Sequence, residues 1–478
     1  MNPVPAPAST PTDGWTALRR ATVAGGVLLV TLNAFEAIAV ATAMPTVAAK
    51  LGALAGYPVA FAIPMAASVI AMVCAGTWAD VRGPRVVLLT GVTLFVGGLL
   101  LAGAAPSMPV LIVGRTIQSL GSGLDMVALY VIIAAMFPES LRPKVFVWTS
   151  AAWVGPSLFG PPLAGLLVTQ VSWRWVFFVA AVFAVPAAAL LVPVLRRLPG
   201  IDGHRHAGAG FTRRAGAAVA AATGACLLSL AAHWSAVLGI GLLVVGIALL
   251  VRSAPKLVPA GTYRLRRGIG SVIMSRALLG AAFSGTDVYL PLMLTGQHGM
   301  SPTAAGLALT SGALSWSAAA WVSGRIRTDD GRRRSIRIGF GALTVGIAVC
   351  LIAAIPAIPA IVVYLGWFVA GCGMGLAYSP LTVLVMGMSA DSEQGRNSSA
   401  LQTNETLTSS VLLAISAVLF GYLVSVSPTG AFAVGIALAL LFALLGSVSA
   451  NRLQPNAGEG GAVGDAGNRP APEDLLAR

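Results

Sequence analysis

The sequence predicts an all-α protein that crosses a membrane many times. Hydrophobic residues make up 57% of its 478 residues and charged residues only 10%, whereas soluble domains carry about 25% charged residues. Its mean hydropathy is +0.85. The second observation is a succession of apolar runs, most of them about 20 residues long, which is the length that a helix needs to cross the hydrocarbon core. The third is a polar loop pattern that recurs in the second half of the chain.

The apolar runs number fourteen, in two sets of six separated by a pair. The first set lies near 21–47, 56–79, 86–105, 108–136, 144–169 and 174–195. The pair lies near 215–232 and 234–252, and the second set near 268–295, 302–326, 336–355, 358–386, 397–425 and 429–450. We therefore expect fourteen spans in two six-helix bundles, residues 21–195 and 268–450. The linker between them, residues 196–267, would contain two extra helices at about 215–252.

Connections rich in Lys and Arg alternate along the chain with connections that contain few of them, as fourteen spans require. Almost every basic cluster falls in a connection on one side, and the other side holds little more than Lys50 and Arg174. Short cytoplasmic loops carry the Lys and Arg excess. We therefore expect a protein of the cytoplasmic membrane whose N-terminal tail (1–20) and disordered C-terminal tail (451–478) both lie in the cytoplasm. The net charge of +14 reflects this orientation, because no nucleic-acid-binding motif accompanies it.

The loop between the second and third spans, residues 76–85, carries the most specific pattern. It reads Gly-Thr-Trp-Ala-Asp-Val-Arg-Gly-Pro-Arg, in which Gly-Pro ends a helix. Its pattern residues are Gly76, Asp80, Arg82, Gly83 and Arg85. The pattern G-x-x-x-D-x-x-G-x-R resembles the loop between helices 2 and 3 of the major facilitator superfamily, and the resemblance implies that these residues form a latch between conformations.

A shift of 248 residues places this loop on a second copy. Gly76 then falls on Gly324, Gly83 on Gly331 and Arg85 on Arg333, with the acid displaced by one residue. A basic loop between two helices would explain the second copy alone. The two copies together indicate a duplicated fold, and we expect Gly331 and Arg333 to belong to the latch as well.

Two further motifs carry the resemblance. In the fourth span, Arg115, Gln118 and Gly121 resemble the superfamily's R-x-x-Q-G-x-G signature, with Ser119 where Gly is usual. The alternative is that Arg115 extends to the membrane surface. In the fifth span, a run resembles the antiporter signature G-x-x-x-G-P-x-x-G-G, a mark of drug exporters. Its residues here are Gly155, Pro156, Gly160, Pro161 and Gly165.

The end of the first span, residues 35–45, resembles the signature L-D-x-T-I-V-N-V-A-L-P. Glu36 stands in the acidic position and Pro45 at the end, although the Asn and the first Thr are missing. Together with the fourteen spans, these motifs resemble the fourteen-helix drug:proton antiporter family over residues 20–450.

Four acids fall inside predicted spans, and they are Glu36, Asp125, Asp287 and Glu405. A charge at the bilayer centre costs about 2.5–3.5 kcal/mol, so these acids must face a cavity or carry a proton, and they are the candidate proton-coupling residues. The repeat places Asp287 opposite Ala39, one turn from Glu36. Two alternatives stay open: Arg115 and Arg276 neutralise two of the acids, Asp125 first, or Glu405 lies in solvent near the cytoplasmic end.

Candidate substrate contacts follow from side-chain chemistry. Polar and aromatic groups inside spans suit an amphipathic or cationic substrate, although each aromatic has packing as an alternative. The candidates are Asn33, Arg115, Gln118, Tyr289, Trp316, Tyr378 and Asn404.

The resemblance implies proton-coupled efflux of amphipathic drugs or antibiotics, cationic or neutral, by a monomer that is not an enzyme and uses the proton gradient instead of a cofactor. The alternative is uptake or export of a specific metabolite or lipid by the same fold. The sequence lacks an ATP-binding phosphate loop, a metal-binding pattern of its four cysteines and any soluble signalling domain.

Overall fold

The computed structural model describes residues 16–453 except 138–140, 142–144, 146–147, 149–150, 198–208, 232–233, 235 and 390–392. All regular secondary structure among these residues is helical. The helices are α1 (Ala17–Lys50), α2 (Val59–Arg82), α3 (Pro84–Ala104), α4 (Met108–Met136), α6 (Val154–Leu166), α7 (Arg174–Arg197), α8 (Ala209–Leu230), α9 (Ala236–Ser253), α10 (Ile269–Asp287), α11 (Tyr289–Gly296), α12 (Pro302–Ser323), α13 (Asp329–Ile352), α14 (Ile361–Met388), α15 (Gln394–Leu423) and α16 (Pro428–Ala450).

Each predicted apolar run overlaps a described helix, with α10 and α11 sharing one run. Within the described ranges, eleven helices are long and apolar enough to cross a membrane. The remaining three are α6, which borders residues that the structure does not describe, and α8 and α12, which are rich in Ala, Gly, Ser and Thr and therefore less apolar. The all-helical membrane architecture is confirmed, and the count of fourteen spans stays a prediction.

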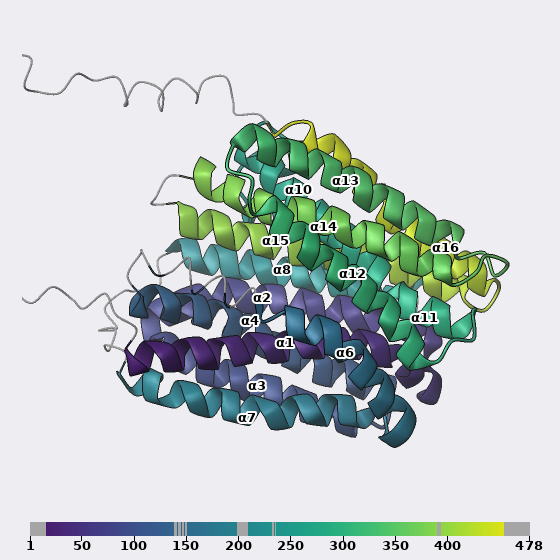
Figure 1. Cartoon of the computed structure of the whole chain (residues 1–478), viewed down its shortest axis with the longest axis horizontal. Coiled ribbons are helices and arrows are strands. Elements are labelled where there is room, and N and C mark those ends of the chain that lie inside the picture. Colours follow the sequence, from purple (N-terminus) through teal and green to yellow (C-terminus); the bar gives the residue numbers. More distant parts are fainter. Residues whose placement is uncertain are drawn as a thin grey trace, which may run out of the picture.

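The helices form two halves with the same internal contacts. The N-half comprises α1–α7 and the C-half α10–α16, and Figure 1 shows them as two groups of parallel and antiparallel helices. In the N-half, α3 packs on α4, α2 on α4, and α1 on α7; in the C-half, α13 packs on α14, α12 on α14, and α10 on α16. The internal repeat that the loop sequences indicate is therefore also present in the way the helices pack.

Glycines bring the backbones of α3 and α4 into contact, and those of α13 and α14 likewise. A Cβ atom at Gly98 would lie 2.3 Å from the backbone nitrogen of Gln118, and one at Gly346 would lie 2.4 Å from that of Ala370. Small residues permit such close approach in membranes. The glycines of the α3–α4 seam are Gly91, Gly98, Gly114 and Gly121, and those of the α13–α14 seam are Gly339, Gly346, Gly366 and Gly373.

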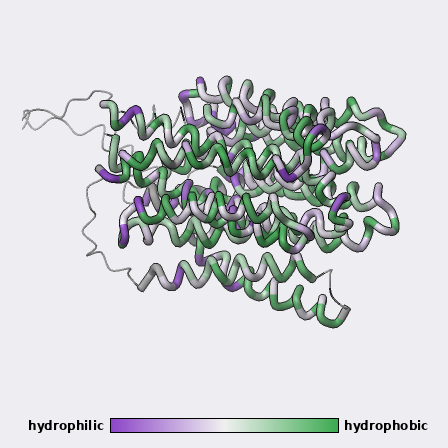
Figure 2. The backbone as a smooth tube through the Cα atoms, turned by 90° about the horizontal axis from the view of Figure 1, so that it is seen from below, coloured by the Kyte–Doolittle hydropathy of each residue, from purple (hydrophilic) through white to green (hydrophobic). Residues whose placement is uncertain are grey.

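Charged and hydrophilic residues gather toward the helix ends, while hydrophobic residues dominate along the helices (Figure 2). Helices of this length cross the molecule once each, so connections alternate between its two ends. The first turn of α1 meets the end of α4, where Arg19 Nε donates to Met136 O at 3.1 Å, and the start of α10 meets the end of α16. We call the end at which α1 begins and α16 finishes the terminal face.

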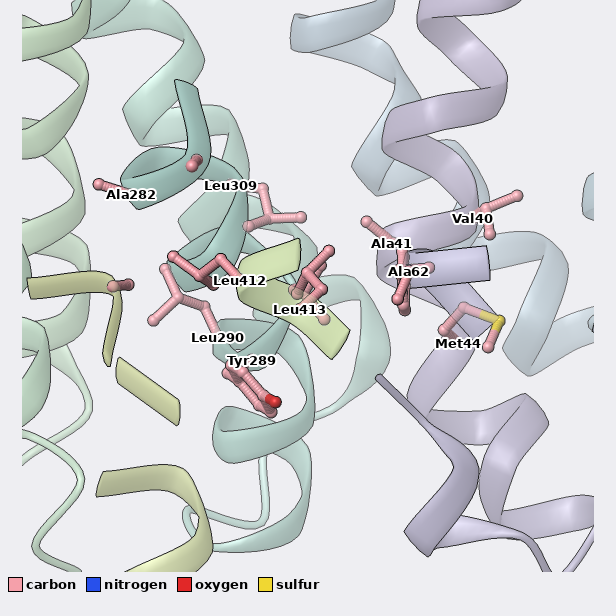
Figure 3. Close-up of a cluster of buried hydrophobic side chains, with 14 of the residues drawn as sticks. Val40, Ala41, Met44, Ala62, Ala282, Tyr289, Leu290, Leu309, Leu412 and Leu413 are labelled. Atoms are coloured by element: carbon pink, nitrogen blue, oxygen red, sulfur yellow. The ribbon is translucent and has the colours of Figure 1, made fainter. Parts of the chain in front are cut away.

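Away from the terminal face, the two halves are sealed against each other. Figure 3 shows Ala41 and Ala62 of the N-half opposite Leu309 and Leu413 of the C-half. The Tyr57 hydroxyl, at the start of α2, donates to the carbonyl of Val288 at 2.7 Å. The main helix pairs across the boundary are α2 with α15 and α6 with α12, which are equivalent under the repeat.

The hairpin of α8 and α9 occupies one side of this boundary. Helix α8 packs against both α2 and α15, and Figure 1 shows it between them. Ala218 of α8 shares an apolar cluster with Val69 of α2 and Leu407 of α15. The hairpin therefore touches both halves on the side opposite the α6–α12 contact.

One predicted boundary is wrong by two turns. The sequence predicts a loop around Gly331 and Arg333, before an apolar run near 336–355, but α13 begins at Asp329. The side chain of Thr328 accepts a hydrogen bond from Gly331 N at 3.3 Å, and two acids occupy the first turn. An N-cap and acidic residues at the positive end of the helix dipole stabilise this start.

Candidate functional site

A carboxylate of α1 and two side chains of α4 meet inside the N-half. Glu36 Oε1 lies 3.6 Å from Arg115 Nη2, and Gln118 Nε2 donates to Glu36 Oε2 at 3.1 Å. All three side chains are buried. We call Glu36, Arg115 and Gln118 the Glu36 centre.

The local geometry of two helices builds the Glu36 centre. Arg115 and Gln118 are three residues apart on α4 and so lie on one face. One turn before Glu36 on α1, Asn33 accepts a hydrogen bond from Ser122, which lies one turn beyond Gln118. A polar stripe on α4 thus faces a polar stripe on α1.

The centre lies deep in the protein. Glu36 is 14 residues from Lys50, the nearer end of α1, which corresponds to about 21 Å at 1.5 Å per residue. Arg115 Nη1 donates to the carbonyl of Ala60 at 2.8 Å, and its guanidinium lies 5.0 Å from the centre of the Phe61 ring. Arg115 therefore neither extends to the surface nor pairs with Asp125. The alternative that arginines neutralise two of the acids holds, but for other acids than Asp125: Arg115 pairs with Glu36 and Arg276 with Glu405.

Tyr57 connects the Glu36 centre to the C-half. It is fully buried, and its phenol lies within electrostatic range of Arg115 and of Asp287. Asp287 is half-buried at the end of α10. Tyr57 thus interacts both with Arg115 of the Glu36 centre and with Asp287, at the seal between the halves.

A second buried ion pair lies in the C-half. Arg276 Nε of α10 is 3.0 Å from Glu405 Oε2 of α15. Arg276 also donates to Thr382 of α14, and its guanidinium carbon lies 3.2 Å from the centre of the Tyr378 ring. We call Arg276, Glu405 and Tyr378 the Arg276 centre. Glu405 is thus paired, and 18% of its side chain is exposed.

Aromatic rings continue from the Arg276 centre. The Trp316 ring lies 5.3 Å from both the Tyr378 and Phe283 rings, and Phe283 stacks on Trp367 at 4.3 Å. The predicted residues Trp316 and Tyr378 are therefore neighbours. Their edge-to-face contacts stabilise the cluster.

The other two C-half candidates lie outside this ring cluster. Asn404, next to Glu405, accepts a hydrogen bond from the Tyr263 hydroxyl at 2.8 Å. Tyr289 has no exposed surface, contacts the Ser416 hydroxyl and packs against Gly435. Its side chain lies among helices of its own half.

The predicted latch lies on the terminal face. Gly83 has a φ of 80°, which only glycine adopts readily, and it joins α2 directly to α3. Arg82 and Arg85 are exposed, and a Cβ at Gly76 would meet open space. The side chain of Asp80 lies outside the described part of the chain.

The second copy of the loop is arranged differently. Gly331 and Arg333 lie in the first turns of α13, where Arg333 Nη1 pairs with Asp330 of the same helix at 3.4 Å.

The antiporter-like motif lies on α6 at the boundary between the halves. A Cβ at Gly165 would lie 2.5 Å from the Cα of Thr303 in α12, and one at Gly306 would lie 2.9 Å from Pro161. Gly160 faces α1, with Ile38 the nearest side chain, whereas Gly155 is exposed and Pro156 is buried. The motif thus permits close contact of α6 with α12.

The sequence patterns do not identify Tyr57 as a site residue, nor Glu405 as the partner of Arg276. Tyr57 follows the short 3₁₀ turn Leu54–Gly56, where an aromatic residue looks like an ordinary interface residue. Arg276 and Glu405 are 129 residues apart, and periodicity within one helix says nothing about partners on another.

Comparison with known proteins places this geometry in a family. The sequence pattern of the Major Facilitator Superfamily matches residues 26–412 and residues 272–475. A protein of Mycobacterium tuberculosis named probable multidrug-efflux transporter is 26% identical over 442 residues, covering 88% of this chain and 91% of that protein. An uncharacterized transporter of Schizosaccharomyces pombe is 30% identical over 178 residues, and this match spans only 30% of its length.

A solved structure shares the fold. The crystal structure of a bacterial homologue of the human lysosomal transporter Spinster, in an inward-facing and occupied conformation, superimposes with a TM-score of 0.63 at 14% identity, covering 93% of this chain and 100% of the other. The match of sequence over both halves, the repeated packing and the loop motifs agree. The chain belongs to the Major Facilitator Superfamily.

Proposed function

We propose that this transporter exports amphipathic drugs or antibiotics, cationic or neutral, across the cytoplasmic membrane in exchange for protons. The observation that carries the proposal is the Glu36 centre, a carboxylate about 21 Å from the nearer end of its helix that is held by one arginine and one amide. The name of the mycobacterial relative supports efflux of several drugs.

The chemistry of exchange follows from the surroundings of Glu36. Burial disfavours the ionised carboxylate, whereas Arg115 at 3.6 Å favours it. Protonation of Glu36 would release Arg115 from the pair and remove the attraction for a cationic substrate. Proton and substrate would then compete for one carboxylate, and this competition is the requirement for exchange.

Alternating access follows from the arrangement of the seal. The halves meet around Tyr57 and Val288, away from the terminal face. If the basic loops lie in the cytoplasm, this seal closes the outer end, and the substrate site is reached from the cytoplasm. Asp287, beside the seal, is the second proton-coupling carboxylate in this scheme, and the Arg276 centre with Trp316 offers a further polar and aromatic surface to the substrate.

A resistance and accumulation profile tests the function. The protein is expressed in a bacterial strain that lacks its own pumps, with cationic, neutral and anionic drugs, with and without a protonophore. We expect lower accumulation of cationic and neutral amphipathic drugs, abolished by the protonophore. Protonophore-insensitive resistance would contradict proton coupling, and proton-driven accumulation of one metabolite inside the cell would show uptake instead.

The latch can be tested by substitution of Asp80, which stands in the last turn of α2 next to the exposed Arg82. We expect Asp80→Asn to leave membrane insertion intact and to slow transport several-fold, because the charge of the latch is lost. The matched control is Glu393→Gln, since the Glu393 side chain is 46% exposed and forms its ion pair with Arg396, three residues along the chain and outside the latch. Equal transport rates of Asp80→Asn and wild type at equal expression would exclude a latch.

A further inference from the structure

Asp125 is a buried acid that neither ion pair uses. It lies on α4 with no exposed surface, and among the described residues neither of its carboxyl oxygens has a hydrogen-bond partner. It faces α3 across the glycine seam, where a methyl group at Gly91 would lie 2.2 Å from Asp125 Oδ1. The carboxyl group is therefore held against a helix backbone.

Charged groups nearby do not compensate Asp125. Helices α1, α2 and α3 pack against α4. Their titratable or charged residues are Arg19, Arg20, Glu36 and Lys50 in α1, Cys74, Asp80 and Arg82 in α2, and Arg85 in α3. Glu36 is engaged by Arg115 and Gln118, and none of the described side chains forms an ion pair or hydrogen bond with Asp125. An ionised carboxylate is costly in such a place, so the neutral form is favoured.

The repeat provides an internal comparison. In the C-half, Gly339 takes the place of Gly91, and a methyl group there would lie 2.9 Å from the Cβ atom of Ala377. Ala377 thus fills the position that Asp125 fills in the N-half, and α13 and α14 pack as closely as α3 and α4. Because alanine satisfies the same packing, the seam does not need a carboxyl group for its structure.

We infer that Asp125 is a proton-binding residue of the α3–α4 seam, that it carries a proton in this conformation, and that it ionises only when α3 and α4 separate enough to admit water. Proton binding at Asp125 then favours the conformation sealed away from the terminal face. The inference concerns the substrate-free protein. It rests on the proposed function only in that the pH-dependent change of conformation would take part in the transport cycle.

The conformation of the substrate-free protein, measured against pH, tests this inference. Spin labels are placed at the exposed positions 86 and 337, near the terminal face of each half, in a variant whose four cysteines are replaced. Distances are measured by pulsed electron paramagnetic resonance in lipid nanodiscs. We expect the distribution to shift between acidic and alkaline pH. In Asp125→Asn and Asp125→Ala we expect the acidic distribution at every pH.

Three controls separate this site from other proton sites. Gly91→Ala, which pushes the seam apart, should move the midpoint of the transition to lower pH, whereas Gly339→Ala should leave the midpoint unchanged. Glu36→Gln should keep the pH-dependent shift that requires Asp125. Failure of the proposed coupling at Glu36 can therefore be distinguished from failure of the inference about Asp125. A pH-dependent shift that survives in both Asp125→Asn and Asp125→Ala, with the proteins monodisperse, would overturn the inference, as would its absence in the wild type.

Discussion

Proteoliposomes containing Glu36→Gln are expected to lose all uphill export of cationic substrates. Glutamine keeps the shape of Glu36 and can bond with Gln118, but it binds no proton and attracts no cation. One-for-one exchange of a proton for a monovalent cation moves no net charge, so the pH difference drives it, and a difference of one pH unit, about 1.4 kcal/mol, supports a concentration ratio of about 10-fold. The measured ratio should therefore fall from roughly this range to no accumulation.

Two further measurements distinguish a loss of proton coupling from a general loss of transport. Downhill flux of neutral substrates should survive in Glu36→Gln, because alternating access itself is intact. Asp287→Asn should weaken export less uniformly across substrates, since Asp287 interacts with Tyr57 and not directly with the Glu36 centre. If Glu36→Gln vesicles retain substrate-induced proton release and full uphill transport, then Asp125, Asp287 or Glu405 carries the coupling.

The second large effect is expected for Arg115→Met. This change leaves Glu36 buried without its cation, and breaking a buried pair in this way costs about 3–5 kcal/mol. Part of the cost disappears if Glu36 takes up a proton, so we expect a folded but less stable protein that does not transport cations. Thermal unfolding in detergent and transport in vesicles measure the two effects.

The double variant separates charge from packing. In Glu36→Gln/Arg115→Met no unpaired charge remains, so stability should return toward the wild-type value while transport stays absent. Arg252→Met, at an exposed position of α9, is the control for removal of a positive charge. A double variant that is as unstable as Arg115→Met would mean that Arg115 acts by packing on Phe61, not by pairing with Glu36.

Much of the fold could be predicted from the sequence, because a helix that crosses the bilayer needs a run of about 20 apolar residues. Apolar runs of helix length gave the positions of the described helices, and the 248-residue shift correctly relates Gly91 to Gly339 and Gly98 to Gly346. The start of α13 was missed, since the hydrophobic pattern begins only at Ile336 whereas the helix is initiated by Thr328. Capping residues, not hydrophobicity, set that end.

The site was predicted in part. Side chains three or four residues apart on α4 were correctly placed on one face, but their partners depend on how α1 approaches α4. Hence Arg115 was assigned Asp125 as the first alternative partner, whereas it pairs with Glu36. Tyr289 is predicted as a substrate contact because it is aromatic and inside a span, and this assignment stays a prediction. Its position against Gly435 follows from the packing of α11 on α16, which no single-helix pattern encodes.

The contact of α8 with both α2 and α15 also bears on how the protein is made. During synthesis the N-half and the α8–α9 hairpin leave the ribosome before the C-half, because domains are produced in chain order. Ala218 can therefore settle against Val69 of α2 long before Leu407 of α15 exists. The hairpin then presents a finished apolar surface to an arriving helix, so the nascent N-half already contains a template on which the second half assembles.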